Sequence, residues 1–420
     1  MEKIQKVELL APAGSYEKAV IAFIYGADAV YVGTPNISLR TRAKVDDDEL
    51  EKIIKYAKAH NKKVYSAINI YADDDQYDEI ISQVKYLSKM DIDGIIASDG
   101  GVVDVIKEYA PNIPVNISTQ ANTISGRACS FWEKNGAKRI ILGREINIDN
   151  LRKIMKNKNK DLEIEVFVHG AICFAYSGRC FLSDYLAKRS ANKGDCAQCC
   201  RWNYKMYLED VNRPGELIEV EEDSNGTTLL SSKDLCLIDE LEELIEMGVD
   251  SFKIEGRLKT EYYLASIINT YRCAIDEILK NKQLKDKTEY TKYLEEIEKV
   301  KTRELTKFNF NIKKNWDVDE IQDLNGRQYN NNYQYGALVD SYLEDEKLAK
   351  VYIKNKISIG DTLELIVPNT LKPLEFKVTT LKDVETLEDI ETINPGKQNQ
   401  MVILNVPVEV QKYYVIRRKK

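Results

Sequence analysis

The feature that most constrains this chain is a regular alternation of short apolar runs with amphipathic helical patterns through its first two thirds. Eight runs rich in Val, Ile or Tyr end in small or polar residues, as strands of a barrel do. Strands that alternate with helices pair in parallel, so the runs predict one parallel sheet covered by helices. The predicted strands are Val7–Gly14, Ala29–Gly33, Lys63–Tyr71, Gly94–Gly100, Val115–Asn122, Arg139–Ile146, Glu163–Gly170 and Ser251–Arg257.

Three stretches between these runs have the period of surface helices. Asp46–Asn61 begins with acidic residues, which favour a helix N-terminus, and its apolar residues follow one stripe. Asp75–Met90 and Lys259–Asn281 have similar patterns. Eight strand and helix units predict an α/β fold of the closed (β/α)8, TIM-like type. An open doubly wound sheet is the alternative, and it is less favoured because no G-x-G-x-x-G follows the first strand.

The interval between the seventh and eighth runs is unusually long. Residues 171–250 contain six of the eight cysteines and end in a predicted crossover helix, Asp234–Met247. An insertion at the carboxyl end of a barrel strand lies where barrel enzymes keep their active sites. We therefore predict a barrel domain over 1–282 with a cysteine-rich insertion at 171–250, a linker at 283–332, and a small all-β barrel at 333–420.

Composition narrows the class of protein. Hydrophobic residues are 43% and charged residues 31% of the 420, which is typical of a soluble globular chain, and we find no membrane-spanning run. The N-terminus has no signal-peptide pattern, so we expect a cytosolic protein. A net charge of −7 argues against non-specific binding of long nucleic acids, although a local basic groove is compatible with it.

The cysteines favour a metal centre. Disulfides are not expected in a reducing compartment, which leaves metal ligation or burial. Cys173 and Cys180 are separated by six residues, and Cys196 and Cys200 flank three more, so four thiolates can converge. Soft sulfur ligands suit zinc or iron–sulfur, and the wide first spacing favours iron–sulfur. Some of the remaining cysteines leave the assignment open: Cys199 and Cys236 could replace a ligand, whereas Cys129 and Cys273 fit buried positions on helices.

Polar residues end most of the predicted strands, where a barrel opens its active-site face. They are Asn69, Asp99, Gln120, Glu145, His169, Glu255 and Arg257. His169 precedes the cysteine insertion and is a candidate proton donor or acceptor, or a partner of the metal ligands. Glu145, Glu255 and Arg257 are further catalytic candidates, and a simple ion pair is the alternative for the last two.

The segment EVFVHGAICFAYSGRCFLS (Glu165–Ser183) resembles the signature of peptidase family U32, the collagenase-like proteases. The resemblance continues through ELLAPAGS, GADAVYVG, STQAN, RSANKGDCAQCCRW, SSKDLC and SFKIEGR, and it extends to the β-rich tail. It implies a 4Fe-4S cluster, because members of this family that hydroxylate RNA bases or ubiquinone precursors carry one. Its implied ligands are Cys173, Cys180, Cys196 and Cys200.

Chain length and the additional β domain resemble the branch that makes 5-hydroxyuridine at the tRNA wobble position with prephenate as a required metabolite. Adding oxygen to a pyrimidine carbon needs a redox cofactor, which agrees with a cluster. Anticodon loops present unpaired bases that a basic and aromatic patch can hold. Candidates for that patch are Arg40, Arg42, Arg179, Lys188, Arg189, Arg201, Trp202 and Tyr204.

Three alternatives stay open. Ribosomal RNA could be the substrate of the same chemistry. A U32-type peptidase is the second, although the chain has no H-E-x-x-H or G-x-S-x-G and only a Cys173–His169 pair resembles a hydrolytic dyad. A non-catalytic RNA-binding protein with a structural zinc is the third, and it leaves the polar strand ends without a role.

Overall fold

The computed structural model describes residues 7–34, 37–38, 45–173, 175–202, 206–209, 214–215, 217–220, 232–281, 287–300, 303–310, 332–396 and 400–420. Three of the candidate RNA contacts, Arg40, Arg42 and Tyr204, lie outside these residues.

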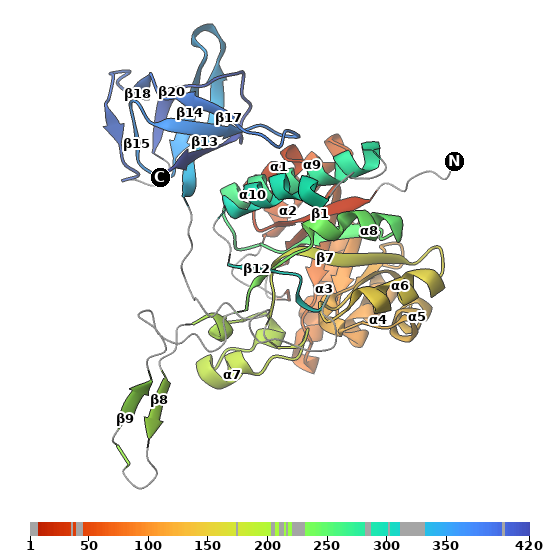
Figure 1. The fold of residues 1–420 in the computed structure, drawn as a ribbon. Helices are drawn as coiled ribbons and strands as arrows, with labels where there is room; N and C mark the ends of the chain where they lie inside the picture. The colour runs from red at the N-terminus through yellow and green to blue at the C-terminus, as the bar shows by residue number, and fades with distance from the viewer. Residues whose placement is uncertain are drawn as a thin grey trace.

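A closed barrel of eight parallel strands forms the larger part of the molecule (Figure 1). Each strand pairs with the next along the chain, and β11 pairs with both β7 and β1 to close the ring. Closure confirms the predicted barrel and excludes the open sheet. The strands are β1 (Glu8–Ala13), β2 (Ala29–Gly33), β3 (Lys63–Ile68), β4 (Gly94–Ala97), β5 (Val115–Ile117), β6 (Ala137–Ile141), β7 (Glu163–Ala171) and β11 (Ser251–Ile254).

Helices follow the strands and cover the barrel (Figure 1). Several begin at a residue whose side chain accepts a hydrogen bond from the first turn, as Ser15, Asp46, Asp99, Ser125 and Asn147 do. Across the described residues, every helix is too short or too polar to cross a membrane. The barrel helices are α1 (Tyr16–Ile24), α2 (Asp47–Ala59), α3 (Tyr77–Leu87), α4 (Gly100–Tyr109), α5 (Gly126–Lys134), α6 (Ile148–Asn157), α8 (Leu241–Glu246) and α9 (Glu261–Asn281).

The predicted helix Asp234–Met247 is wrong in its first part. Asp234–Cys236 forms strand β10, which pairs antiparallel with the end of β7, and α8 begins only at Leu241. The reason is the length of β7, whose pairing with β6 ends at Glu165, so that the rest of β7 leaves an edge for β10 to cover on the side opposite β11. Strand β12 (Leu305–Thr306) pairs in turn with β10. Cys236 is therefore a strand residue and not the first residue of a helix.

Charged side chains form a buried chain inside the barrel. Arg139 on β6 lies 2.5 Å from Glu8 on β1 and 3.0 Å from Glu165 on β7. The other Glu165 oxygen accepts a hydrogen bond from Nζ of Lys253 on β11, at 2.9 Å. These residues are at most 8% exposed, so each charge depends on its neighbour for stabilisation. The chain of ion pairs leads from the base of the barrel towards its carboxyl end.

Residues 332–420 form an antiparallel all-β domain with its own apolar core. Its main sheet has the order β17-β16-β21-β13-β14-β20-β18. The prediction of a C-terminal all-β domain is confirmed. The strands are β13 (Tyr333–Leu343), β14 (Leu348–Ile353), β16 (Thr362–Ile366), β17 (Leu374–Lys377), β18 (Leu381–Asp383), β20 (Met401–Asn405) and β21 (Val415–Lys419).

This β domain is attached to the outside of the barrel by buried polar contacts. The hydroxyl of Tyr25, the residue directly after α1, donates to the Ile366 carbonyl at 2.9 Å and accepts from the Val415 amide at 2.8 Å. Asn269 on α9 makes two further hydrogen bonds, to Thr370 and Asn369. Figure 1 shows the domain beside α1, α9 and α10 (Thr291–Glu298), far from the cysteine-rich segment and its helix α7 (Leu182–Ala187).

Candidate functional site

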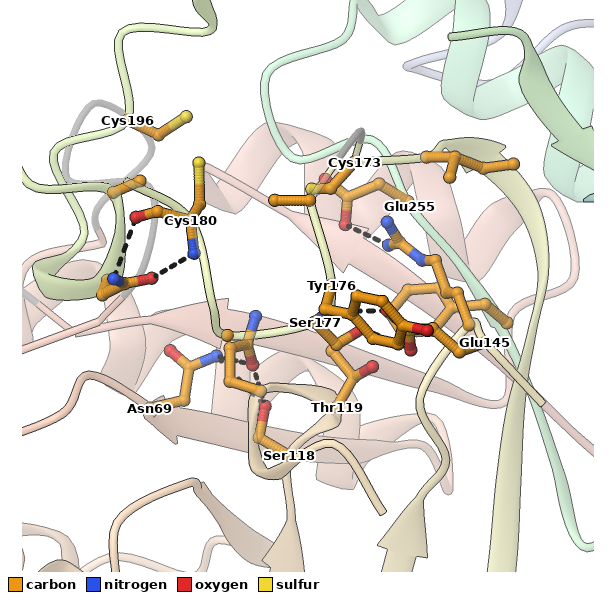
Figure 2. A pocket seen from close by; sticks show the side chains of 18 of the residues that line it. Asn69, Ser118, Thr119, Glu145, Cys173, Tyr176, Ser177, Cys180, Cys196 and Glu255 are labelled. Carbon is orange, nitrogen blue, oxygen red and sulfur yellow. Dashed lines mark hydrogen bonds and ion pairs between the residues drawn. The ribbon is translucent and has the colours of Figure 1, made fainter. Parts of the chain in front are cut away.

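A cavity of about 160 Å³ opens at the carboxyl end of the barrel. One water needs roughly 10–15 Å³ of such space, so the cavity has room for a small organic group. Its floor comes from strands and the residues directly after them, and its roof is the cysteine-rich segment (Figure 2). The barrel residues that line it include Tyr31, Asn69, Ser118, Gln120, Arg144, Glu145, Phe167, Lys253, Glu255 and Arg257.

Four cysteines line this cavity, and they are the four that the sequence singled out: Cys173, Cys180, Cys196 and Cys200. Cys199 is buried at 1% exposure and does not belong to the lining set. Cys236 lies in β10, with its sulfur 3.7 Å from the Tyr271 hydroxyl. Cys129 on α5 is buried and Cys273 on α9 is half-buried, both away from the cavity lining.

Several of these thiols lie close enough to one another to interact electrostatically. Burial raises the pKa of the Cys199 thiol, and the negative charges of Cys196 and Cys180 raise it further. The Gln198 amide donates to the Cys196 sulfur at 3.4 Å, a contact that stabilises a thiolate. Figure 2 shows the Cys180 and Cys196 side chains directed toward one another.

These thiols do not form a single-ion site as they stand. Within the described ranges, no group of three or more His, Cys, Asp or Glu residues is arranged to hold one metal ion. A four-iron cluster makes a different demand, because each of its cysteines binds a different iron atom and the sulfurs surround the cluster. Four soft donors that line one cavity fit such a group in the chemistry of their donor atoms.

The cysteine-rich segment is held by contacts with the barrel and by hydrogen bonds within the segment. Glu145, after β6, accepts hydrogen bonds from the amide and hydroxyl of Ser177, at 2.6 and 3.0 Å. Gly178 has φ +71°, and the position of a Cβ there would be 2.2 Å from the Gln120 carbonyl oxygen. Asn192 bonds both the amide and the carbonyl of Cys180. Glu145, a predicted catalytic residue, thus holds the segment that carries Cys173 and Cys180.

Part of the cavity lining is polar and charged. Glu255 accepts a hydrogen bond from the Tyr31 hydroxyl at 3.1 Å and lies 3.9 Å from the Arg144 guanidinium. The Lys253 ammonium is 4.3 Å from the centre of the Tyr31 ring, and burial lowers its pKa. The Arg257 guanidinium is 5.8 Å from the same ring. The structure therefore places the predicted Glu255 and Arg257 in the cavity, together with two cations that the sequence analysis did not select.

His169 has a different position from the one we expected. It is 1% exposed and, among the described residues, does not line the cavity. Its Nδ1 is 3.3 Å from the Tyr271 hydroxyl, and its Nε2 has no hydrogen-bond partner. Burial lowers its pKa to about 4, so the ring is neutral at pH 7. This position supports packing beneath the cysteine segment and gives no support to direct contact with a substrate.

The remaining polar strand ends divide into two groups. Asn69 and Gln120 line the cavity, where the Asn69 amide donates to the Gln120 side-chain oxygen at 3.2 Å. Asp99 instead caps α4 by accepting from the amides of Gly101 and Val102. Strand-end position alone could not separate these roles, because a helix cap also follows a strand directly.

The candidates for RNA contact differ in their solvent exposure and in their contacts with other residues. Arg179 and Lys188 are exposed. Arg189 forms an ion pair with Asp195, and Arg201 lies 3.9 Å from buried Asp234 and donates to the Ile172 carbonyl at 3.2 Å. The ring of Trp202 is 43% exposed. Arg201 thus helps to hold the cysteine segment on β10, whereas Arg179, Lys188 and Trp202 face solvent.

Lys253, Arg144 and Tyr31 are among the cavity residues that sequence reasoning missed. A signal for Lys253 existed. Glu8, Arg139, Glu165 and Lys253 are charged residues inside apolar strands, and such residues in a closed barrel point into its interior and pair there. Arg144 and Tyr31 gave no comparable pattern.

Comparison with known proteins agrees with this architecture. The model for peptidase family U32 matches residues 14–319, and that for the peptidase family U32 C-terminal domain matches residues 331–417. The chain is 34% identical to tRNA hydroxylation protein P of Escherichia coli (strain K12), across 98% of this chain and 96% of that protein. It is 33% identical to tRNA hydroxylation protein P1 of Bacillus subtilis (strain 168), across 97% and 92%.

A third relative acts on a different RNA by its name. It is a 23S rRNA 5-hydroxycytidine synthase of Escherichia coli (strain K12), 34% identical across 66% of this chain and 40% of that protein. The family models cover both domains described above, and the first two relatives align over nearly their whole lengths. The chain belongs to peptidase family U32.

Proposed function

We propose that this chain is an RNA-modifying oxidoreductase that hydroxylates the wobble uridine of tRNA at carbon 5 in the cytoplasm. Two relatives that share nearly its full length are named for tRNA hydroxylation. The observation that carries the proposal is the cavity at the barrel mouth, where four cysteines face polar and charged strand ends. Hydroxylation of ribosomal RNA is the second candidate, favoured by the third relative over a smaller share of the chain.

The proposed cofactor is a 4Fe-4S cluster on Cys173, Cys180, Cys196 and Cys200. When bound, it would supply the redox chemistry that no side chain provides. The chain's own contribution is to hold the four thiols at the cavity. Glu145 fixes Ser177, and Asn192 fixes the backbone of Cys180.

Side chains of the barrel would orient the base. The amides of Asn69 and Gln120 offer a donor and an acceptor, which matches the alternating polar edge of a pyrimidine. Glu255 is the carboxylate of the cavity wall that is held by Tyr31 and Arg144, and we propose that it accepts the proton lost from carbon 5. Arg257 and Lys253 would balance negative charge near the reacting ring.

We also propose prephenate as the required metabolite. It carries two carboxylates, and the guanidinium groups of Arg144 and Arg257 both line the cavity. Guanidinium groups bind carboxylates through paired hydrogen bonds. A strain unable to make prephenate should then lack the modified nucleoside even when the protein is present.

The site supports the peptidase hypothesis less well than it supports RNA hydroxylation. A cysteine and histidine dyad requires a hydrogen bond between the nucleophile and its base. His169 bonds Tyr271 through Nδ1, its Nε2 has no partner, and its pKa of about 4 makes it a poor base near neutral pH. Cys173, by contrast, is exposed at the cavity.

The experiment is mass spectrometry of nucleosides from purified tRNA and ribosomal RNA of a deletion strain. We expect 5-hydroxyuridine derivatives to disappear from tRNA, to return with the wild-type gene, and to stay absent with Cys180→Ala. Loss confined to ribosomal RNA would select the second candidate. Unchanged nucleosides in both RNAs would reject the proposal.

A further inference from the structure

The cysteine-rich segment has an unusual outer surface. Within the described residues, eleven large apolar side chains are exposed, and five of them fall between residues 176 and 202. Four of those five are aromatic: Tyr176, Phe181, Tyr185 and Trp202. Folding normally buries such rings, so this concentration at one site indicates a binding surface.

Two of these rings lie on one face of a short helix. Phe181 directly precedes α7 and is 79% exposed, and Tyr185 lies one turn later at 78%. Residues four apart on a helical turn project from the same face. Phe181, Leu182, Asp184 and Tyr185 line a shallow depression there. We call Phe181 and Tyr185 with this depression the α7 platform.

The α7 platform is continuous with the candidate active site. Leu182 lines both the depression and the cavity, so one side chain separates the two. Tyr176, 63% exposed, stands at the cavity itself (Figure 2). A polymer with one of its groups in the cavity can therefore extend over the adjoining platform.

The positive charge of residues 176–202 favours a nucleic acid as the partner of this surface. Residues 176–202 contain five basic and two acidic residues, in a protein whose net charge is −7. Asp195 is paired with Arg189, and Arg179 and Lys188 are exposed. Exposed aromatic rings among basic residues are the surface that unpaired nucleotides bind, with bases stacked on rings and phosphates near the cations. Asp184 in the depression would repel a phosphate, so the platform itself suits bases.

We infer that the α7 platform stacks the unpaired bases that flank the target nucleotide of a single-stranded RNA loop. This inference rests on the proposed function, because it assigns the loop to the cavity whose chemistry is proposed above. It assigns roles to Phe181 and Tyr185, which are not among the residues that line the cavity and would act in RNA binding only.

The test measures RNA binding by fluorescence anisotropy with the full-length, anaerobically purified protein. The probes are a hairpin RNA with an unpaired loop and a blunt duplex without unpaired nucleotides. The variants are Phe181→Ala/Tyr185→Ala, Phe181→Leu/Tyr185→Leu, and Phe131→Ala. Phe131 is the matched control, since it is an aromatic ring with 58% exposure on α5.

We expect the double alanine variant to bind the hairpin about tenfold more weakly or worse, because each lost stack weakens binding severalfold. The double leucine variant should fail similarly, since it keeps apolar surface but no ring. Phe131→Ala should bind as wild type does, and duplex binding should not change in any variant. Melting temperature and iron content should also be unchanged.

Wild-type hairpin affinity in the double alanine variant would overturn the inference. So would recovery by leucine, which would indicate an apolar protein partner, or a change of oligomeric state, which would indicate a second copy of this chain. The proposed function is judged separately by the nucleosides of the deletion strain. If the modification depends on the gene while the double alanine variant binds the hairpin normally, only the inference about the α7 platform is rejected.

Discussion

Gly178→Ala is expected to separate the cysteine segment from the barrel without unfolding the protein. At Gly178, an added Cβ would be 2.2 Å from the Gln120 carbonyl oxygen and 2.9 Å from the Tyr71 hydroxyl, where ordinary contact begins at 3.4 Å. The carbonyl belongs to the backbone after β5 and cannot turn aside. The segment must therefore retreat by about 1 Å, a displacement that at an active site costs on the order of a hundredfold in rate.

The backbone conformation adds a second and separate cost. A side chain at φ +71° costs about 1–2 kcal/mol, whatever the surrounding space. Gly248 has φ +79° and nothing within 4 Å of its added Cβ, so Gly248→Ala carries that cost without the clash. Both variants should lose at least this small free energy of unfolding, measured in urea titrations followed by circular dichroism.

Only Gly178→Ala should also lose iron and tRNA modification. Iron is measured by elemental analysis of anaerobically purified protein, and modification by nucleoside mass spectrometry of the complemented deletion strain. Wild-type iron content and modification in Gly178→Ala would refute the reasoning, because the segment would then tolerate displacement from β5. An equal loss in Gly248→Ala would show that general stability, and not the contact with Gln120, controls the site.

Two further predictions concern the barrel interior. Arg139→Met leaves Glu8 and Glu165 buried without their shared cation, so the free energy of unfolding in urea should fall by about 3–5 kcal/mol, and a fall below 1 kcal/mol would contradict the buried ion chain. Burial lowers the pKa of His169 from 6.5 to about 4, so the unfolded chain takes up this proton at a higher pH than the folded protein does. The free energy of unfolding should therefore decrease as the pH falls from 6.5 towards 4, by about 3 kcal/mol in all. His169→Gln should lose that part of the pH dependence in urea titrations at several pH values, and an unchanged profile would place the effect elsewhere.

The barrel was predictable because its signal is repeated. Eight apolar runs of strand length with helical patterns between them leave few topologies, and parallel pairing follows from the alternation. Strand β10 could not be predicted in this way. Asp234–Cys236 is three residues long and precedes helix-forming residues, and its conformation depends on the exposed end of β7.

The sequence was sufficient to predict where the candidate site lies, but only some of the residues that form it. Glu145 and Glu255 follow strands, and so does Asp99, but a strand-end position does not distinguish a cavity wall from a helix cap. His169 follows the same pattern in sequence, yet the antiparallel pairing of β10 with β7 encloses it. Exposure of Phe181 and Tyr185 was not predictable either, because large apolar side chains are normally assigned to a core.

The most direct test of the central claim is the iron and acid-labile sulfide content of anaerobically purified protein. The account predicts about four irons and four sulfides per chain, lost in alanine variants of Cys173, Cys180, Cys196 and Cys200 and kept in Cys199→Ala. Stoichiometric zinc in the wild type, or full iron retention in Cys180→Ala, would contradict a redox cluster held at the barrel mouth by these four thiols.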